Sequence, residues 1–266
     1  MVGKQWIRGA RLGNGRFGIV YLAMDNSDGL LVTVRQVELP ESAADEVERA
    51  RSQTLLRTCE TEITLLKNLK HENIVRFLNS TQDAQYANFF FEYMPGGTLA
   101  SLLEKYGAFE ESLARNFVRQ ILRGLSYLHD LGITHSGLRC AHILVNNTMV
   151  VKLCGPRMAE AHDLANPEES IFWIPPEVIR GSHQWSTKSD IWSLGCTLIE
   201  MLSAEHPYPK LTASEFISEI AIGGMRPSIP SDISSEAQDF LGQTFEPDSE
   251  RPSAVDLLNH PWMRAS

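Results

Sequence analysis

The sequence changes character at Pro95-Gly96-Gly97, and this break constrains the fold more than any other feature. Before it, short apolar runs alternate with turn signals such as Asn26-Ser27-Asp28-Gly29, which predicts antiparallel strands. After it, amphipathic helical stretches dominate. The strand-like runs are residues 17–24, 30–37, 74–78 and 88–93, with a helical stretch at about 43–69, and the later helical runs are 112–129, 189–202, 214–222, 235–244 and 254–258. The pattern predicts two lobes, a small one with a β-sheet and a larger helical one.

Composition limits the classes of partner. The chain has 266 residues, with 24 Lys and Arg against 33 Asp and Glu, and its net charge of −9 argues against nucleic-acid binding. The first residues lack the apolar run of a signal peptide, and the apolar stretch at 191–202 is too short to span a bilayer. Four cysteines without a CxxC pair are typical of reduced thiols in a cytosolic protein. We therefore expect no nucleic acid, no membrane and a cytoplasmic location.

A glycine-rich segment, Gly13-Asn14-Gly15-Arg16-Phe17-Gly18, lies between two strand-like runs. Glycines there let a hairpin backbone approach phosphates closely, although a G-x-G-x-x-G pattern alone also fits a tight turn. A dinucleotide-binding fold would need a helix directly afterwards, whereas a strand follows here. Together with Arg35 in Val32-Thr33-Val34-Arg35, where V-A-I-K would fall, the segment resembles the ATP-covering loop of a protein kinase.

The resemblance to protein kinases extends over nearly the whole chain. Three stretches, at residues 35–40, 71–75 and 93–99, look like those of MAP kinase kinase kinases. The resemblance to protein kinases implies an α+β, bilobal protein-kinase-like fold in a single domain over 1–266. Its N-lobe is expected at about 1–93, its hinge at about 92–97 and its C-lobe at about 98–266. The further anchors are Glu62 in the αC helix, a hinge at 91–94, a catalytic loop at 135–144, Pro175-Pro176-Glu177, Asp190 to Gly195, and Arg251.

Four positions depart from the residues that the resemblance implies for phosphoryl transfer. Arg35 replaces the β3 lysine and is expected to pair with Glu62, Gly137 replaces the catalytic Asp, and His142 replaces the metal-binding Asn. Gly155 replaces the Asp of D-F-G, and no Asp or Glu occurs between residues 131 and 159. Hard divalent cations need such oxygen ligands. No catalytic residue is therefore assigned.

These departures predict a pseudokinase that is not an enzyme, requires no cofactor and does not use Mg²⁺. We expect it to act as a scaffold or allosteric regulator whose protein partner is an active kinase or another MAP kinase pathway component. The alternatives are a serine/threonine kinase or other ATP-dependent transferase with a nonstandard mechanism, and an ATP-sensing switch. ATP binding without metal stays open, with weak contacts assigned to Gly13, Gly15, Gly18, Val20, Thr33, Arg35, Glu92, Met94 and Leu144.

Several residues that could pass for functional ones are assigned to structure instead. The kinase resemblance implies that His135 is a core histidine and that charged anchors hold the C-lobe together. Soft ligands at His135, Cys140, His142 and Cys154 would suit zinc, but their spacing matches no recognised finger, and no metal is assigned. The residues assigned to structure are Glu62, His135, Glu177, Asp190 and Arg251.

Overall fold

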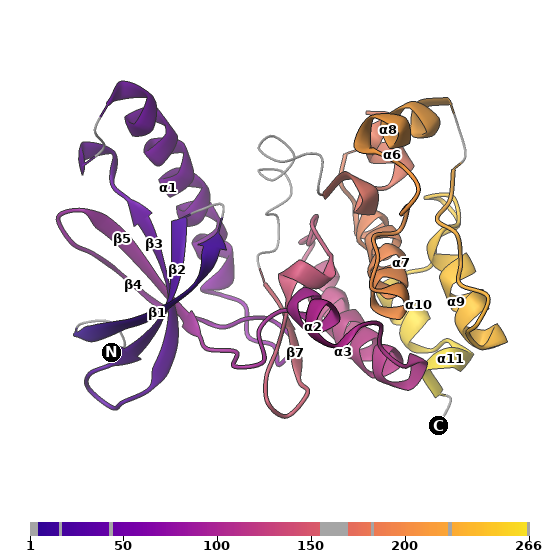
Figure 1. Cartoon of the computed structure of the whole chain (residues 1–266), viewed down its shortest axis with the longest axis horizontal. Helices are drawn as coiled ribbons and strands as arrows, with labels where there is room; N and C mark the ends of the chain where they lie inside the picture. Colours follow the sequence, from indigo (N-terminus) through magenta and orange to yellow (C-terminus); the bar gives the residue numbers. More distant parts are fainter. Residues whose placement is uncertain are drawn as a thin grey trace. The chain divides into compact units, whose positions relative to one another are not determined.

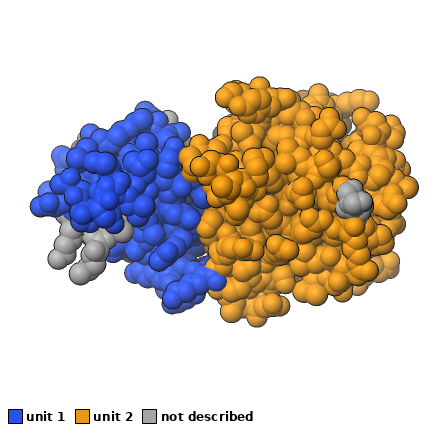
Figure 2. Space-filling view, turned by 90° about the horizontal axis from the view of Figure 1, so that it is seen from below, with its two compact units in different colours: residues 1–70, 75–94 blue, residues 71–74, 95–266 orange. Residues whose placement is uncertain are grey.

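A computed structural model describes residues 5–15, 18–42, 45–154, 170–181, 184–222 and 225–264. The chain divides into two compact units, coloured separately in Figure 2. Unit 1 comprises Met1–Lys70 and Val75–Met94, and unit 2 comprises His71–Ile74 and Pro95–Ser266. The chain leaves unit 1 for the last time directly before the Pro95-Gly96-Gly97 break.

Unit 1 is built on one antiparallel sheet with the strand order β1-β2-β3-β5-β4 (Figure 1). A turn at Asp25, whose carboxylate accepts a hydrogen bond from Ser27 N at 2.8 Å, joins two of the strands and contains Gly29 at φ 74°. The strands are β1 (Trp6–Gly15), β2 (Gly18–Asp25), β3 (Leu31–Glu38), β4 (Phe77–Gln82) and β5 (Tyr86–Glu92).

One predicted strand is misplaced. The run at 74–78 has apolar residues typical of a strand, yet β4 begins only at Phe77. Ile74 is buried and instead forms an isolated bridge with Leu153, so that its β-prone side chain is used inside unit 2.

The two faces of the sheet carry different side chains, because successive residues of a strand point to opposite faces. One face carries the core of unit 1, where Ala23, Val32, Val34 and Phe90 are buried and Trp6 and Leu78 pack against them. The opposite face carries Val20, Arg35 and Phe89, which lie directly across from one another on β2, β3 and β5. Arg35 is thereby placed outside the apolar core.

Helix α1 (Glu46–Leu66) is the single α-helix among the described residues of unit 1 and lies beside β3 (Figure 1). It begins where Asp45 accepts a hydrogen bond from Glu48 N at 2.8 Å. Cys59, Glu62, Ile63 and Leu66 are buried along it. The observed helix is shorter at both ends than the predicted stretch at 43–69. A short 3₁₀ turn, η1 (Pro40–Ser42), precedes it.

Unit 2 is mainly helical and packs around α7 (Thr187–Ser203), most of whose residues are buried. Ser186 and Ser189 form a capping box at its start. The other elements are α2 (Leu99–Tyr106), α3 (Glu111–Asp130), η2 (Cys140–His142), β6 (Ile143–Val145), β7 (Val151–Leu153), η3 (Ile171–Trp173), α6 (Pro176–Ile179), α8 (Ala213–Ile222), α9 (Ser235–Thr244), α10 (Ala254–Leu258) and α11 (Pro261–Arg264).

The predicted α+β fold, with a small antiparallel sheet and a larger helical part, is confirmed. Among the described residues, none of the helices combines the length and the apolar character needed to cross a membrane.

Two glycines test how tightly α7 is packed. A Cβ at Gly195 in α7 would overlap Thr244 and the ring of Phe245, whereas a Cβ at Gly242 in α9 meets no atom within 4 Å. We expect Gly195→Ala to lower the free energy of unfolding by about 1–3 kcal/mol through overpacking. The control, Gly242→Ala, should raise it by about 0.5–1 kcal/mol, because alanine favours helix. Urea unfolding measures both, and equal effects would contradict the packing described here.

Candidate functional site

The glycine-rich segment joins β1 to β2. Gly13 pairs with Val20 and Gly15 with Gly18, so a strand follows the segment directly. Gly18 has φ 114°, and a Cβ there would overlap the carbonyl oxygen of Gln36. Only glycine fits this position. Arg16 and Phe17 lie outside the described residues.

Arg35 and Glu62 form an ion pair between β3 and α1. The Nη1 of Arg35 lies 2.7 Å from Oε2 of Glu62, and the two side chains are 14% and 5% exposed. The guanidinium also lies over the ring of Phe91, 5.1 Å from its centroid. Burial raises the pKa of the neighbouring Cys59 thiol to about 11, which keeps it protonated and unreactive. The pair fixes a positive charge on the Val20 face of the sheet.

The predicted hinge residues lie at the end of β5. Thr33 is paired with Phe91, and Glu92 is paired with Val32. Glu92 and Arg76 are joined twice, since Arg76 N donates to the Glu92 carboxylate at 2.6 Å and Glu92 N donates to Arg76 O at 3.0 Å. Met94 is buried. The Glu92 backbone amide is therefore engaged within unit 1.

In unit 2, the loop that carries Gly137 is anchored on Asp190 of α7. This fully buried carboxylate accepts hydrogen bonds from His135 N and Ser136 N, both at 2.8 Å, and lies 2.8 Å from Nε2 of His129. Ser136 is held at φ 53°, a conformation uncommon for residues other than glycine. The ring of His135 is fully buried, and burial lowers its pKa. His135 and Asp190, which the kinase resemblance assigns to structure, are both fully buried.

His142 turns toward its own loop. Its Nδ1 lies 2.6 Å from the carbonyl oxygen of Gly137, and its carbonyl accepts a bond from the Cys154 thiol at 3.1 Å. Within the described residues, no group of three or more His, Cys, Asp or Glu side chains could hold a metal ion. The zinc alternative at His135, Cys140, His142 and Cys154 therefore gains no support.

Leu144 lies in β6, opposite Lys152 of β7, and it also bridges to Thr98 before α2. Gly155 and the residues through 169 lie outside the described residues, so the D-F-G position is not placed.

Glu200 of α7 joins η2, which follows the Gly137 loop, to η3. Its Oε2 accepts hydrogen bonds from Cys140 N and from Nε1 of Trp173, both at 3.1 Å, and burial raises its pKa. No motif singles out Glu200 in the sequence. The sequence signal that could have found Glu200 is its place as the one acidic residue in the largely apolar stretch at 191–202. A carboxylate in a buried helix needs hydrogen-bond partners.

Glu177 and Arg251 form a second enclosed ion pair. Nη1 of Arg251, a residue 1% exposed, lies 2.8 Å from Oε1 of Glu177, and the same guanidinium donates to the carbonyls of Lys188 and Glu246 at 2.7 and 3.1 Å. It also lies over the ring of Trp192. These contacts tie the start of α6 to α7 and to the segment before α10.

A family profile described as protein kinase domain matches residues 6–263. The chain belongs to the protein kinase domain family. It is 42% identical to a mitogen-activated protein kinase kinase kinase of Pyricularia oryzae over 97% of this chain and 30% of that protein. It is 36% identical to a serine/threonine-protein kinase of Saccharomyces cerevisiae, over 98% and 42% of the two chains. It is 38% identical to mitogen-activated protein kinase kinase kinase 2 of Arabidopsis thaliana, over 97% and 41%.

The kinase domain thus spans less than half the length of these relatives. All three are named as kinases, which contradicts the prediction of an inactive scaffold that is not an enzyme. The prediction that no cofactor is required and that Mg²⁺ is not used is wrong on the same grounds, since kinases of this family use ATP with Mg²⁺. The physical reason is that phosphoryl transfer relies mainly on positioning and charge, and the contacts that position these segments are retained around the departing side chains.

Removing the charge of Glu177 tests the enclosed pair. We expect Glu177→Gln to lower the free energy of unfolding by about 2 kcal/mol, because the buried Arg251 loses its nearest counter-charge and keeps only Asp248, 3.9 Å from its Nη1. The matched control is Glu246→Gln, whose pair with Arg226 is 3.4 Å long and 48% and 37% exposed. That change should cost less than about 1 kcal/mol. Urea unfolding of both variants distinguishes the two, and a loss below 1 kcal/mol for Glu177→Gln would contradict the structural role.

Proposed function

We propose that this domain is a MAP kinase kinase kinase-like serine/threonine kinase that transfers a phosphoryl group from ATP, supplied with Mg²⁺, to a protein hydroxyl by a nonstandard mechanism. The observation that carries the proposal is the similarity to named kinases of this kind at 36–42% identity over 97–98% of the chain. The enclosed Arg35–Glu62 pair supports it, because it provides a fixed cation.

The nucleotide contacts assigned from the sequence are part of the proposal. The backbone of Gly13, Gly15 and Gly18 would contact phosphates, which the lack of a side chain permits. Val20, Thr33 and Leu144 would contact the adenine. The hinge at Glu92 and Met94 would bind the edge of the adenine through backbone groups other than the Glu92 amide, which already donates to the carbonyl of Arg76. Arg35 would neutralise phosphate charge.

The proposed mechanism depends on charge and position more than on proton transfer. The transferred group passes through a loose, metaphosphate-like transition state, so the attacking hydroxyl needs little activation early on. The new bond forms between that oxygen and the γ-phosphorus while the bond to ADP breaks, and the hydroxyl proton passes to an oxygen of the transferred group. No carboxylate lies between residues 131 and 159. The Mg²⁺ therefore enters as part of the ATP substrate, held by its phosphates.

The names of two of the relatives state a position above MAP kinase kinases in a kinase cascade. We propose a MAP kinase kinase as the protein substrate and partner of this domain, and a cytoplasmic location, which the few cysteines without a CxxC pair support.

Transfer of labelled γ-phosphate from ATP to a MAP kinase kinase tests the function. We expect Mg²⁺-dependent incorporation that is slow, because a general base contributes about 10²–10⁴-fold. Gly137→Asp should raise the rate by about 10²-fold, since it supplies a base in the catalytic loop. Arg35→Met should abolish transfer.

The matched control, Arg226→Met, removes an exposed arginine elsewhere in the chain and should leave the rate unchanged. Absence of incorporation by both the natural chain and Gly137→Asp would overturn the proposal.

A further inference from the structure

Strand β1 is an edge strand of the unit 1 sheet, since among the described strands it pairs with β2 alone. It has ten residues, and those from Ile7 to Leu12 are exposed. An edge strand presents backbone amides and carbonyls with which another strand can pair. β1 is therefore a long open edge of this sheet.

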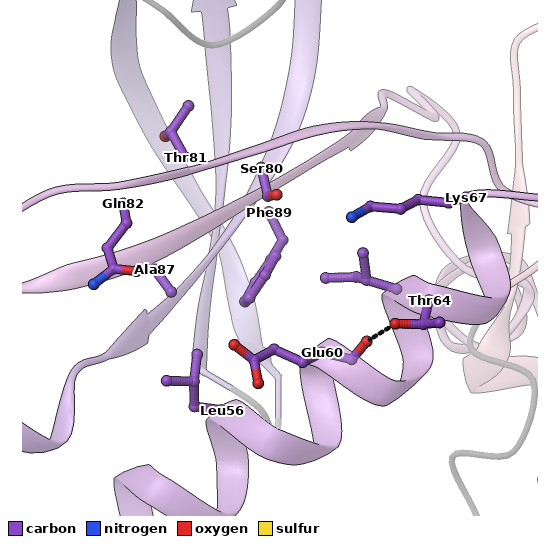
Figure 3. A pocket seen from close by; sticks show the side chains of 10 residues that line it. Leu56, Glu60, Thr64, Lys67, Ser80, Thr81, Gln82, Ala87 and Phe89 are labelled. Carbon is purple, nitrogen blue, oxygen red and sulfur yellow. Dashed lines mark hydrogen bonds between the residues drawn. The ribbon is translucent and has the colours of Figure 1, made fainter.

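The other edge strand, β4, is shorter and more enclosed. It has six residues and borders, together with β5 and α1, a hollow of about 370 Å³ (Figure 3). In Figure 3 the side chain of Phe89 points from β5 toward α1, and Leu56 and Lys67 of α1 lie on either side of it. Helix α1 thus lies against the β4 end of the sheet.

Alternate backbone groups of β1 point toward its open edge. Asn26 N donates to Gln5 O at 3.0 Å, which makes these two residues a hydrogen-bonded pair just before the β1–β2 ladder. Bonded and non-bonded pairs alternate along an antiparallel ladder. The amides and carbonyls of Trp6 and Arg8 therefore point away from β2, where an added strand can bond to them.

A break in the register gathers positive charge on one face of β1. Arg8 lies opposite Ala23, and a register shift places Arg11 opposite Tyr21. Ala23 and Tyr21 are two residues apart on β2 and share a face, so both arginines lie on that face. The guanidinium of Arg8 lies over the Tyr21 ring, 5.0 Å from its centroid, and donates to Gln36 at 3.3 Å. β1 contains these two arginines and no acidic residue.

The other face of β1 ends an apolar row. Ile7, Met24 and Leu31 lie directly across from one another on β1, β2 and β3, and their exposed fractions are 53%, 36% and 48%. Contiguous exposed apolar side chains, unlike scattered ones, indicate an interaction surface. Because Ile7 stands at the edge of the sheet, an added strand would extend the row with an apolar side chain of its own.

We propose that the edge of β1 pairs with an extended segment of a partner protein in which acidic residues alternate with apolar ones. The backbone of the segment bonds to the outward groups of Trp6 and Arg8, as in strand addition to a sheet edge. Alternate side chains of a strand point to opposite faces, so the acidic ones meet the two arginines while the apolar ones meet Ile7. A second copy of this chain fits less well, because pairing β1 with β1 brings like charges together.

The test is fluorescence anisotropy of a fluorescein-labelled peptide, Gly-Glu-Val-Glu-Val-Glu-Val-Gly, titrated with the protein. We expect saturable binding. The peptide Gly-Glu-Glu-Glu-Val-Val-Val-Gly has the same composition without the alternation, and it should bind about tenfold more weakly because its acids cannot share one face.

Methylating the backbone nitrogens of either the three valines or the three glutamates removes the donors from one edge of the alternating peptide. One of these two methylated peptides should lose binding and the other should keep it, because only one edge of an added strand faces β1.

Arg11→Glu reverses a charge on the arginine face, so it should weaken the alternating acidic peptide about tenfold and strengthen the binding of Gly-Lys-Val-Lys-Val-Lys-Val-Gly. Because Arg11 is exposed, the variant should fold, and its thermal unfolding is checked alongside. The matched control is Arg57→Glu, the same charge change at an exposed position of α1 in the same unit, which should leave the binding of both peptides unchanged.

Equal effects of the two variants, equal binding of the two methylated peptides, or no binding of the alternating acidic peptide to the natural chain would overturn the proposal. So would equal binding of the peptide without alternation. Self-association in sedimentation velocity that Arg11→Glu abolishes would also overturn it, because the occupant would then be a second copy of the chain. The experiment measures binding alone and does not depend on catalysis.

Discussion

The buried carboxylate of Asp190 is the contact on which the loop region of unit 2 depends. A buried charge is costly unless it is fully hydrogen-bonded, and here it accepts the amides of His135 and Ser136 and lies beside His129. These bonds hold Ser136 in an unfavourable backbone conformation directly before Gly137. Two further side chains of α7 act on the neighbouring segment, since Ser193 donates to the carbonyl of Trp173 at 2.8 Å and Glu200 accepts from its indole. One buried helix therefore sets the position of both segments.

In unit 1, the Arg35–Glu62 ion pair is the organising contact, as Asp190 is in unit 2. It joins β3 to α1 across a largely enclosed contact and leaves a cation on the face of the sheet that also carries Val20. Gly137 and His142 stand where the kinase resemblance implies a catalytic Asp and a metal-binding Asn. The hydrogen bonds that hold their loop are nevertheless present. Under the proposed function, phosphoryl transfer by this protein kinase domain would rely on electrostatics and orientation.

Local signals predicted much of the fold. The turn at Asn26 to Gly29 predicted β2 and β3 closely, and Ser234 and Ser253 cap the two helices whose bounds matched, α9 and α10. The strand β4 was misplaced because Ile74 looks like a strand residue but is used in a bridge to Leu153. The partners of Glu200 and the hollow beside Phe89 join segments far apart in the chain, so no local pattern indicates them. The motif positions alone led to the wrong prediction of inactivity, because they report individual side chains and not the framework that positions them.

The most direct test of the central claim, that the domain binds ATP with Mg²⁺ as a kinase does, is a thermal-shift titration with ATP in the presence and absence of Mg²⁺, using an active kinase domain as control. A ligand that binds only the folded state adds about 2.7 kcal/mol of stability at a hundredfold excess over its dissociation constant. We predict a rise in Tm with ATP and Mg²⁺ together that is larger than with ATP alone. No shift at millimolar nucleotide, or a shift that Mg²⁺ abolishes, would contradict the account.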